Sequence, residues 1–87
     1  KRQADAGEDR TVNVDEEGKA TVLLDGGRSY DPDGSIGEWA WEDGNSRIIG
    51  DTPQLRVRLS RGVHVFHLTV TDDRGASNKS TITVQVR

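Results

Sequence analysis

The residues of this chain whose chemistry is most suggestive are carboxylates, which fall in three short groups along the sequence. They are Asp5, Glu8 and Asp9, then Asp31 and Asp33, then Asp72 and Asp73. Carboxylates brought together by a fold repel one another unless a cation, an arginine or a proton lies between them. Calcium suits such a group, because it takes about six to eight oxygen ligands from flexible loops. A calcium site among these groups is therefore one interpretation, with Asp31, Asp33 and Asp72, and also Asp5 and Asp73, as candidate ligands.

A second interpretation needs no metal. Asp31-Pro32-Asp33-Gly34 has the composition of a tight turn, in which proline takes the second position and aspartate side chains accept backbone N–H groups. Arg28 or Arg74 can also neutralise the acidic groups directly. An EF-hand loop is excluded, because glycine stands fourth from Asp31 rather than sixth. Calcium and turn chemistry both remain open at this point.

A few aromatic and arginine side chains are candidates for contact with a ligand. Trp39 and Tyr30 can stack on a sugar or on a partner's side chain if they are exposed. Arg56 and Arg58 lie on one face of a predicted strand and suit an acidic protein or a polysaccharide. The alternative is structural. Trp41, and Trp39 with it, would pack in the core, and outward arginines would keep the sheet soluble and discourage strand association.

The sequence contains no clear motif for catalysis. The two histidines, His64 and His67, face opposite sides of one predicted strand, so they cannot ligate one ion together. We expect His64 to lie on the same face as Phe66 and His67 to be solvated between its neighbours. A serine–histidine–aspartate set can be drawn, but no nucleophile elbow or pocket accompanies it. We therefore expect no enzyme activity and no catalytic residue.

The elements that must position these residues are strands. Apolar residues alternate with polar ones in short runs, and a period of two is typical of strands with one buried face. Glycine, often after aspartate, separates the runs, as tight turns require. The expected strands cover residues 12–14, 20–24, 36–42, 46–50, 55–59, 66–70 and 82–86. About seven short strands with regular turn signals predict an all-β, antiparallel sandwich with Greek-key order. A small open barrel is the competing architecture.

Length and composition limit what the chain can be. With 87 residues it has room for one domain, and it has no cysteine to form a disulfide. A net charge of −3 with interspersed signs argues against a nucleic-acid partner. The longest apolar run, Val22-Leu23-Leu24, is far too short to insert across a membrane. We expect a monomeric domain over residues 1–87, with residues 1–5 as a linker remnant of a longer chain.

Several motifs occur in an order that resembles the polycystic kidney disease (PKD) domain family. They are Ala4–Asp9, Leu24-Asp25-Gly26, Ser29–Ile36, Trp39-Ala40-Trp41 with Asp43-Gly44, and Gly62 followed by Phe66–Gly75. The resemblance implies an immunoglobulin-like sandwich in an extracellular or cell-surface multidomain protein, where it acts as a spacer or a binding module. It also implies calcium binding in some members through the equivalents of Asp31, Asp33 and Asp72. The chain departs from the family pattern at His64, where an aromatic residue is usual, and in a shortened turn after Trp41.

The predicted topology arranges these residues at two poles. In a Greek-key sandwich the three acidic groups gather at the pole where the chain begins, and an odd number of strands sends Arg87 to the other pole. We predict a non-catalytic extracellular spacer or interaction module, joined to flanking domains and rigidified by calcium at its N-terminal pole. The alternative is an accessory module of a secreted hydrolase that binds carbohydrate or a collagen-like polymer. Asn78-Lys79-Ser80 also matches the N-glycosylation acceptor pattern, although such short matches arise readily by chance.

Overall fold

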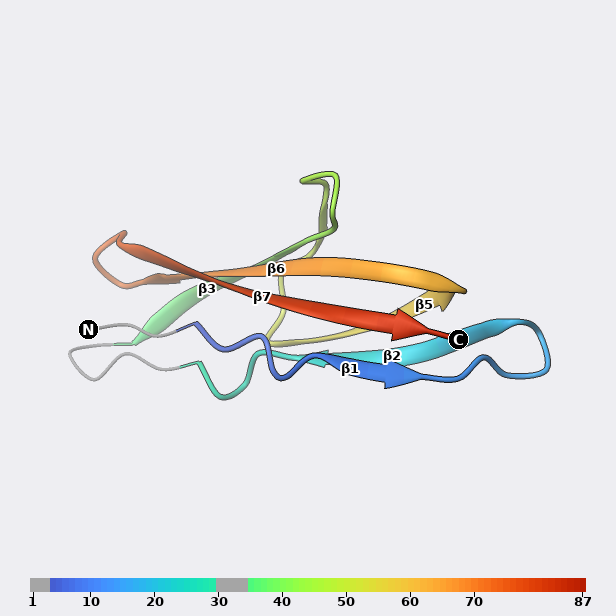
Figure 1. Cartoon of the computed structure of the whole chain (residues 1–87). Coiled ribbons are helices and arrows are strands. Elements are labelled where there is room, and N and C mark those ends of the chain that lie inside the picture. Colours follow the sequence, from blue (N-terminus) through green and yellow to red (C-terminus); the bar gives the residue numbers. More distant parts are fainter. Residues whose placement is uncertain (1–3, 30–34) are drawn as a thin grey trace.

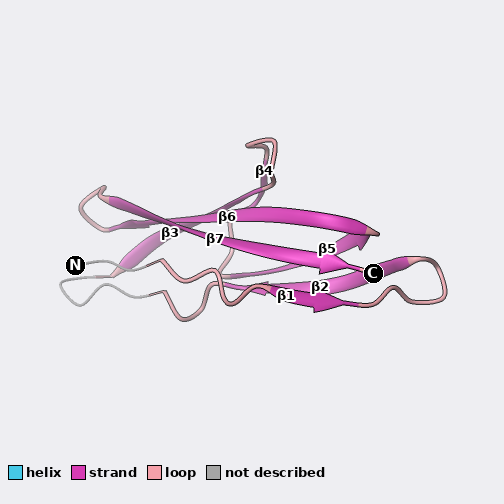
Figure 2. Ribbon diagram, in the orientation of Figure 1, coloured by secondary structure: helices cyan, strands magenta, loops and turns pink. Residues whose placement is uncertain are grey.

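The computed structural model describes residues 4–29 and 35–87, and within these ranges every regular element is a strand (Figure 2). The strands are β1 (Arg10–Val12), β2 (Lys19–Asp25), β3 (Ile36–Glu42), β4 (Ile48–Gly50), β5 (Gln54–Ser60), β6 (Gly62–Asp72) and β7 (Ser77–Val86). They form a five-stranded sheet in the order β1-β7-β6-β3-β4 and a two-stranded sheet of β2 and β5. Figure 1 shows the two layers, and the predicted all-β sandwich is confirmed. The described ranges contain no helix that could cross a membrane.

The two-stranded sheet follows directly from the alternation in its sequence. In β2, Ala20, Val22 and Leu24 are buried, whereas the residues that alternate with them are exposed. β5 pairs antiparallel with β2 and places Val57 opposite Val22. Arg56 and Arg58 take the intervening positions and are exposed. Successive side chains of a strand point to opposite faces, so the alternation puts the arginines and Leu23 in solvent and the other aliphatic residues toward the core.

Trp41 lies at the centre of the core. It is fully buried on β3, opposite Leu68 of β6. Its indole Nε1 donates a hydrogen bond to the backbone carbonyl of Thr52 at 2.9 Å, which satisfies the one polar atom of the side chain. The largest fully buried side chains are Trp41, Leu24, Leu68, Val70 and Val84. The prediction that Trp41 is a core residue is confirmed.

Gly26 stands where the backbone passes close to this core. A Cβ atom added to it would lie 2.6 Å from Cδ2 of Leu68 and 3.2 Å from Cζ2 of Trp41. The N–H of Gly26 donates to the carbonyl of Pro53 at 2.7 Å, which fixes the backbone at this position. A larger residue would have to displace packed side chains, so the close approach explains the glycine.

β1 differs from the prediction in direction and position. It pairs parallel with β7, from Arg10 opposite Val84 to Val12 opposite Val86, whereas we predicted antiparallel pairing throughout. The reason is that the N-terminal segment starts beside the beginning of β7 and runs along it in the same direction. The strand ends before the predicted residues 13–14, although Val14 still donates its N–H to the carbonyl of Arg87 at 2.9 Å.

The N-terminal segment before β1 is fastened to β7 by side chains rather than by a strand ladder. The N–H of Ala4 donates to Oδ1 of Asn78 and the N–H of Ala6 donates to Oγ of Ser80, each at 3.0 Å. Both alanines are buried. Ala4 and Asp5 therefore belong to the folded domain rather than to the predicted linker remnant, and residues 1–3 lie outside the described residues.

The described chain begins and ends at opposite ends of the sandwich. Ala4 contacts Asn78 near the start of β7, whereas Arg87 directly follows the last residue of β7. Ten residues of extended strand separate these points by about 30 Å. The molecule is elongated, with extents of 45 × 20 × 15 Å, and Figure 1 shows β2, β6 and β7 running along its long axis.

Candidate functional site

The N-terminal pole comprises Ala4, Asp5, Ser29, Ser35 and the turn between β6 and β7, and it holds the described members of the predicted acidic site. The N–H of Asp5 donates to Oγ of Ser29 at 2.9 Å, and the N–H of Asp73 donates to the carbonyl of Ser35 at 3.0 Å. Ser29 and Ser35 stand on either side of residues 30–34 in the sequence. The predicted residues Tyr30, Asp31 and Asp33 lie outside the described residues.

Asp72 organises the turn between β6 and β7. Its Oδ1 accepts the N–H groups of Arg74 and Ala76, each at 2.9 Å, and its own N–H donates to the carbonyl of Ala76 at 2.9 Å. Gly75 completes the turn with a φ of 84°, in the left-handed region that favours glycine. These contacts are the turn chemistry of the second interpretation, and they serve the fold whether or not a cation binds.

Asp9 does not join the N-terminal pole, so that part of the prediction is wrong. Its Oδ1 accepts the N–H of Thr83 at 2.8 Å. Thr83 stands about 20 Å along β7 from Ser77, given the rise of an extended strand. The reason is the parallel course of the N-terminal segment, which carries each successive residue farther from the pole. Among the residues in ranges 4–29 and 35–87, no three acidic or histidine side chains form a group that could hold a metal ion.

Arg58 belongs to an ion-pair cluster that sequence reasoning missed. Its Nη1 donates to Oδ2 of Asp15 at 2.8 Å and to Oγ1 of Thr21 at 3.0 Å, and its Nη2 donates to Oε1 of Glu17 at 2.5 Å. The hydrogen bond from Arg58 lowers the pKa of Asp15, and the same bond raises the pKa of Arg58. The acidic turn before β2 was visible in the sequence. The sequence does not show that Arg58 is the partner of this turn, because the register between β2 and β5 decides which arginine reaches the turn.

Trp39 packs against the edge of the core and is only partly exposed. It lies on β3 opposite Val70, and its indole Nε1 is buried without a hydrogen-bond acceptor among the described residues. Partial burial reduces the surface that Trp39 offers for stacking on a sugar. Arg56 is exposed on the outer face of β5. Ligand contact by Trp39, Tyr30, Arg56 and Arg58 stays a prediction.

The two histidines face opposite sides of β6, as predicted. The ring of His64 stacks on that of Phe66, with 6.5 Å between the ring centroids and 12° between the planes. Its Nε2 lies 2.8 Å from the carbonyl of Ser60. On the other face, Nδ1 of His67 lies 2.8 Å from Oγ1 of Thr81. Both rings thus have structural partners within the sheet and its adjoining turn.

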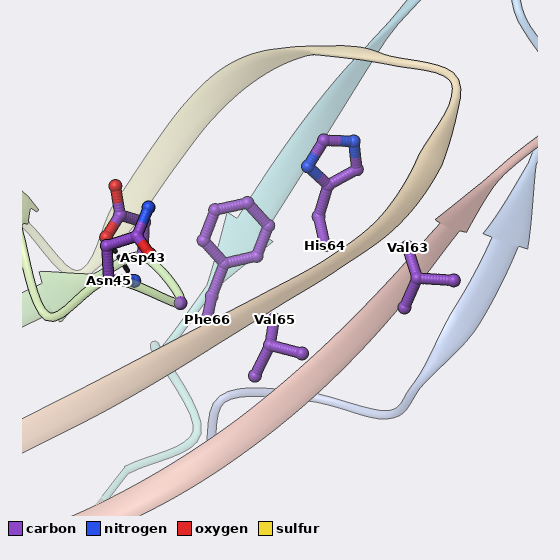
Figure 3. A pocket seen from close by; sticks show the side chains of 7 residues that line it. Asp43, Asn45, Val63, His64, Val65 and Phe66 are labelled. Carbon is purple, nitrogen blue, oxygen red and sulfur yellow. Dashed lines mark hydrogen bonds between the residues drawn. The ribbon is translucent and has the colours of Figure 1, made fainter.

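A hollow lies between the turn after β3 and the first residues of β6 (Figure 3). It is lined by Asp43, Gly44, Asn45, Val63, His64, Val65 and Phe66. Oδ1 of Asp43 accepts the N–H groups of Arg47 at 3.0 Å and Asn45 at 2.9 Å, and these bonds lower the pKa of Asp43. The lining holds no serine, threonine or cysteine that could serve as a nucleophile beside His64. This hollow therefore offers no arrangement for covalent catalysis.

Comparison with known domains agrees with this architecture. The family model described as "K319L-like, PKD domain" matches residues 6–86. The solution structure of the PKD domain from KIAA 1837 protein superposes with a TM-score of 0.77 at 30% identity, covering 98% of this chain and 85% of that one. The crystal structure of the PKD1 domain of Vibrio anguillarum Epp superposes with a TM-score of 0.63 at 26% identity, covering 100% of this chain and 89% of that one.

Two full-length relatives are similar over most of this chain. The dyslexia-associated protein KIAA0319 of Homo sapiens is 41% identical over 76 residues, and its Mus musculus homolog is 37% identical over 73 residues. Each match covers 77% of this chain but only 7% of the relative. The chain therefore spans a small part of the length of these relatives.

Proposed function

This chain belongs to the K319L-like PKD domain family, and from that membership we propose that it is a non-catalytic extracellular module that spaces and connects parts of a larger protein. The family match covers nearly the whole chain. In the human relative the similar region is only 7% of the protein, so there it is one part among many. That organisation supports a connecting role for this chain as well.

The observation that carries the spacer role is the parallel pairing of β1 with β7. Tension applied at the two chain ends pulls β1 toward its beginning and β7 toward its end. In parallel strands these two directions slide one strand along the other, so the bonds between them bear the load together. The bonds at the end of the pair run from Arg87 N–H to the Val12 carbonyl and from Val14 N–H to the Arg87 carbonyl, each at 2.9 Å.

A single-molecule pulling experiment tests this proposal. Because the chain has no cysteine, handles can be attached through introduced cysteines at chosen positions. Handles at Lys1 and Arg87 load the β1–β7 pair in shear, and we expect a high unfolding force. Handles at Glu16 and Arg87 pull on the same end of both strands, which separates their bonds one after another, and we expect a clearly lower force. Equal forces in the two directions would overturn the spacer proposal.

The finer proposal is that calcium binds at the N-terminal pole and stiffens it. Support comes from the bonds of Asp5 to Ser29 and of Asp73 to Ser35, since these two serines flank residues 30–34 in the sequence. Asp31, Asp33 and Asp72 remain the proposed ligands, with Asp5 and Asp73 as further ones, and a cation would relieve repulsion among their carboxylates. Titration with millimolar calcium is the appropriate test, because extracellular modules bind it at about 10⁻⁴–10⁻³ M.

A further inference from the structure

The sequence Asn78-Lys79-Ser80 occupies the beginning of β7, next to the N-terminal pole. It satisfies the acceptor pattern for N-glycosylation, because the middle residue is lysine rather than proline. Asn78 is exposed. The pattern alone is a weak signal, so the surroundings of the asparagine side chain decide whether a glycan is compatible with the fold.

The hydrogen bonding of Asn78 leaves the reactive atom available. Oδ1 accepts the N–H of Ala4 at 3.0 Å. Because a backbone N–H is a donor, it must face the amide oxygen, and this determines which way the amide is turned. Nδ2 consequently faces away from Ala4, and no hydrogen bond joins it to another residue in the described ranges. A glycan attached to Nδ2 leaves the carbonyl oxygen in place, so the bond to Ala4 survives the modification.

The edge of β7 beside Asn78 lacks complete backbone pairing with a neighbouring strand. On the side away from β6, β1 pairs with β7 only at residues 84–86. Along the first half of β7 the neighbour is the N-terminal segment, which is held through the side chains of Asn78 and Ser80 instead of a backbone ladder. The N-terminal segment, with its buried Ala4 and Ala6, covers this edge without a backbone ladder, and a bulky solvated group at Asn78 would hinder another strand from displacing the segment.

We propose that Asn78 is an N-glycan acceptor and that its glycan shields the first half of the β7 edge beside the incoming chain. This inference rests on the proposed extracellular function, since the modification occurs during secretion. The step is a glycosyl transfer from a lipid-diphosphate-linked oligosaccharide. Nδ2 forms a bond to C1 of the first sugar, the bond from C1 to the diphosphate oxygen breaks, the lipid diphosphate leaves with the electron pair, and Nδ2 gives up one proton.

The experiment expresses the chain behind a cleavable secretion signal in human cells and analyses the secreted product by peptide mass spectrometry. We expect a glycan on Asn78 that peptide-N-glycosidase removes, converting Asn78 to aspartate. Ser80→Thr retains a hydroxyl in the acceptor pattern and is expected to keep the glycan. Ser80→Ala and Asn78→Gln are expected to lose it. A folded, secreted chain with unmodified Asn78 would overturn the proposal.

A second measurement tests where the glycan lies. Thermal melting of the secreted chain before and after deglycosylation is expected to show an unchanged or higher melting temperature with the glycan, because Oδ1 still binds Ala4. A clearly lower melting temperature of the glycosylated chain would contradict the inference that Nδ2 faces away from Ala4. The pulling experiment uses unglycosylated chain, so failure of the spacer proposal and failure of this one give separate results.

Discussion

The two tryptophans of β3 differ in one hydrogen bond, and replacing each by phenylalanine turns that difference into a prediction about stability. Trp41 is fully buried and its Nε1 donates to the Thr52 carbonyl. Trp39 is partly exposed and its buried Nε1 has no acceptor among the described residues. Phenylalanine removes the N–H in both cases. The loss breaks a bond at Trp41 and relieves an unpaired donor at Trp39.

The magnitudes follow from these surroundings. Trp41→Phe leaves the Thr52 carbonyl without its donor and leaves part of the indole site empty, which together cost about 2–4 kcal/mol. Trp39→Phe loses some apolar contact but removes a buried unpaired N–H that costs about 1–3 kcal/mol, so its net effect is expected within about 1 kcal/mol of zero. A domain of this size has about 5–10 kcal/mol in total. Trp41→Ala, at about 3–5 kcal/mol, should bring it close to unfolding.

Thermal unfolding, followed by the fluorescence of the remaining tryptophan and by circular dichroism, measures the stability of both variants. Each kcal/mol corresponds to about 4–8 °C in melting temperature for a domain of this length. We therefore expect Trp41→Phe to melt at least about 8 °C below the parent chain, and Trp39→Phe to melt near it. If the two substitutions cost the same, or if Trp39→Phe costs more, the assigned roles of the two indoles are wrong.

Three further predictions concern calcium, pH and backbone approach. Millimolar calcium should raise the melting temperature of the domain. Asp33→Ala should abolish that rise, whereas Asp15→Ala, at the opposite pole, should leave it intact. If calorimetry shows neither a heat of calcium binding nor a shift in melting temperature, the aspartates serve as turn residues and the calcium proposal is wrong. Asp15 and Asp43 have lowered pKa values in the folded state, so their stabilisation is present above the unfolded value near 3.8 and is lost as the pH falls through the folded values. Melting curves between neutral and acidic pH should show this loss, and Asp43→Asn, which keeps an acceptor oxygen, should make it smaller. Gly26→Ala should destabilise the domain by about 1–3 kcal/mol through the close contacts of its Cβ, whereas Gly37→Ala, with nothing within 4 Å, should lack that penalty; equal losses in chemical denaturation would refute the packing argument.

The acidic site shows how far residue types alone can lead. Asp72 lies at the predicted pole, and Asp73 reaches Ser35 beside the residues that contain Asp31 and Asp33. The number and spacing of the carboxylates are visible in the sequence. Whether each one binds a cation or accepts backbone N–H groups is not. Asp72 caps its own turn, and Asp9 binds Thr83 far from the pole. A carboxylate accepts backbone N–H groups as readily as it accepts a cation, and only the path of the backbone decides which donors lie within reach.

Local patterns by themselves determined most of the strands of this protein and the turns that separate them. Alternation places every second side chain on one face, so the buried faces of β2 and β5 follow from neighbouring residues alone. It puts Trp39 and Trp41 on the same face of β3, and tertiary packing leaves Trp41 as the fully buried one. Tertiary structure alone decided the parallel pairing of β1 with β7, the fastening of Ala4 by Asn78 and the pairing of Arg58 with Asp15. Each of these joins residues more than forty positions apart. Such contacts depend on sheet order and register, which leave no periodic trace in the chain.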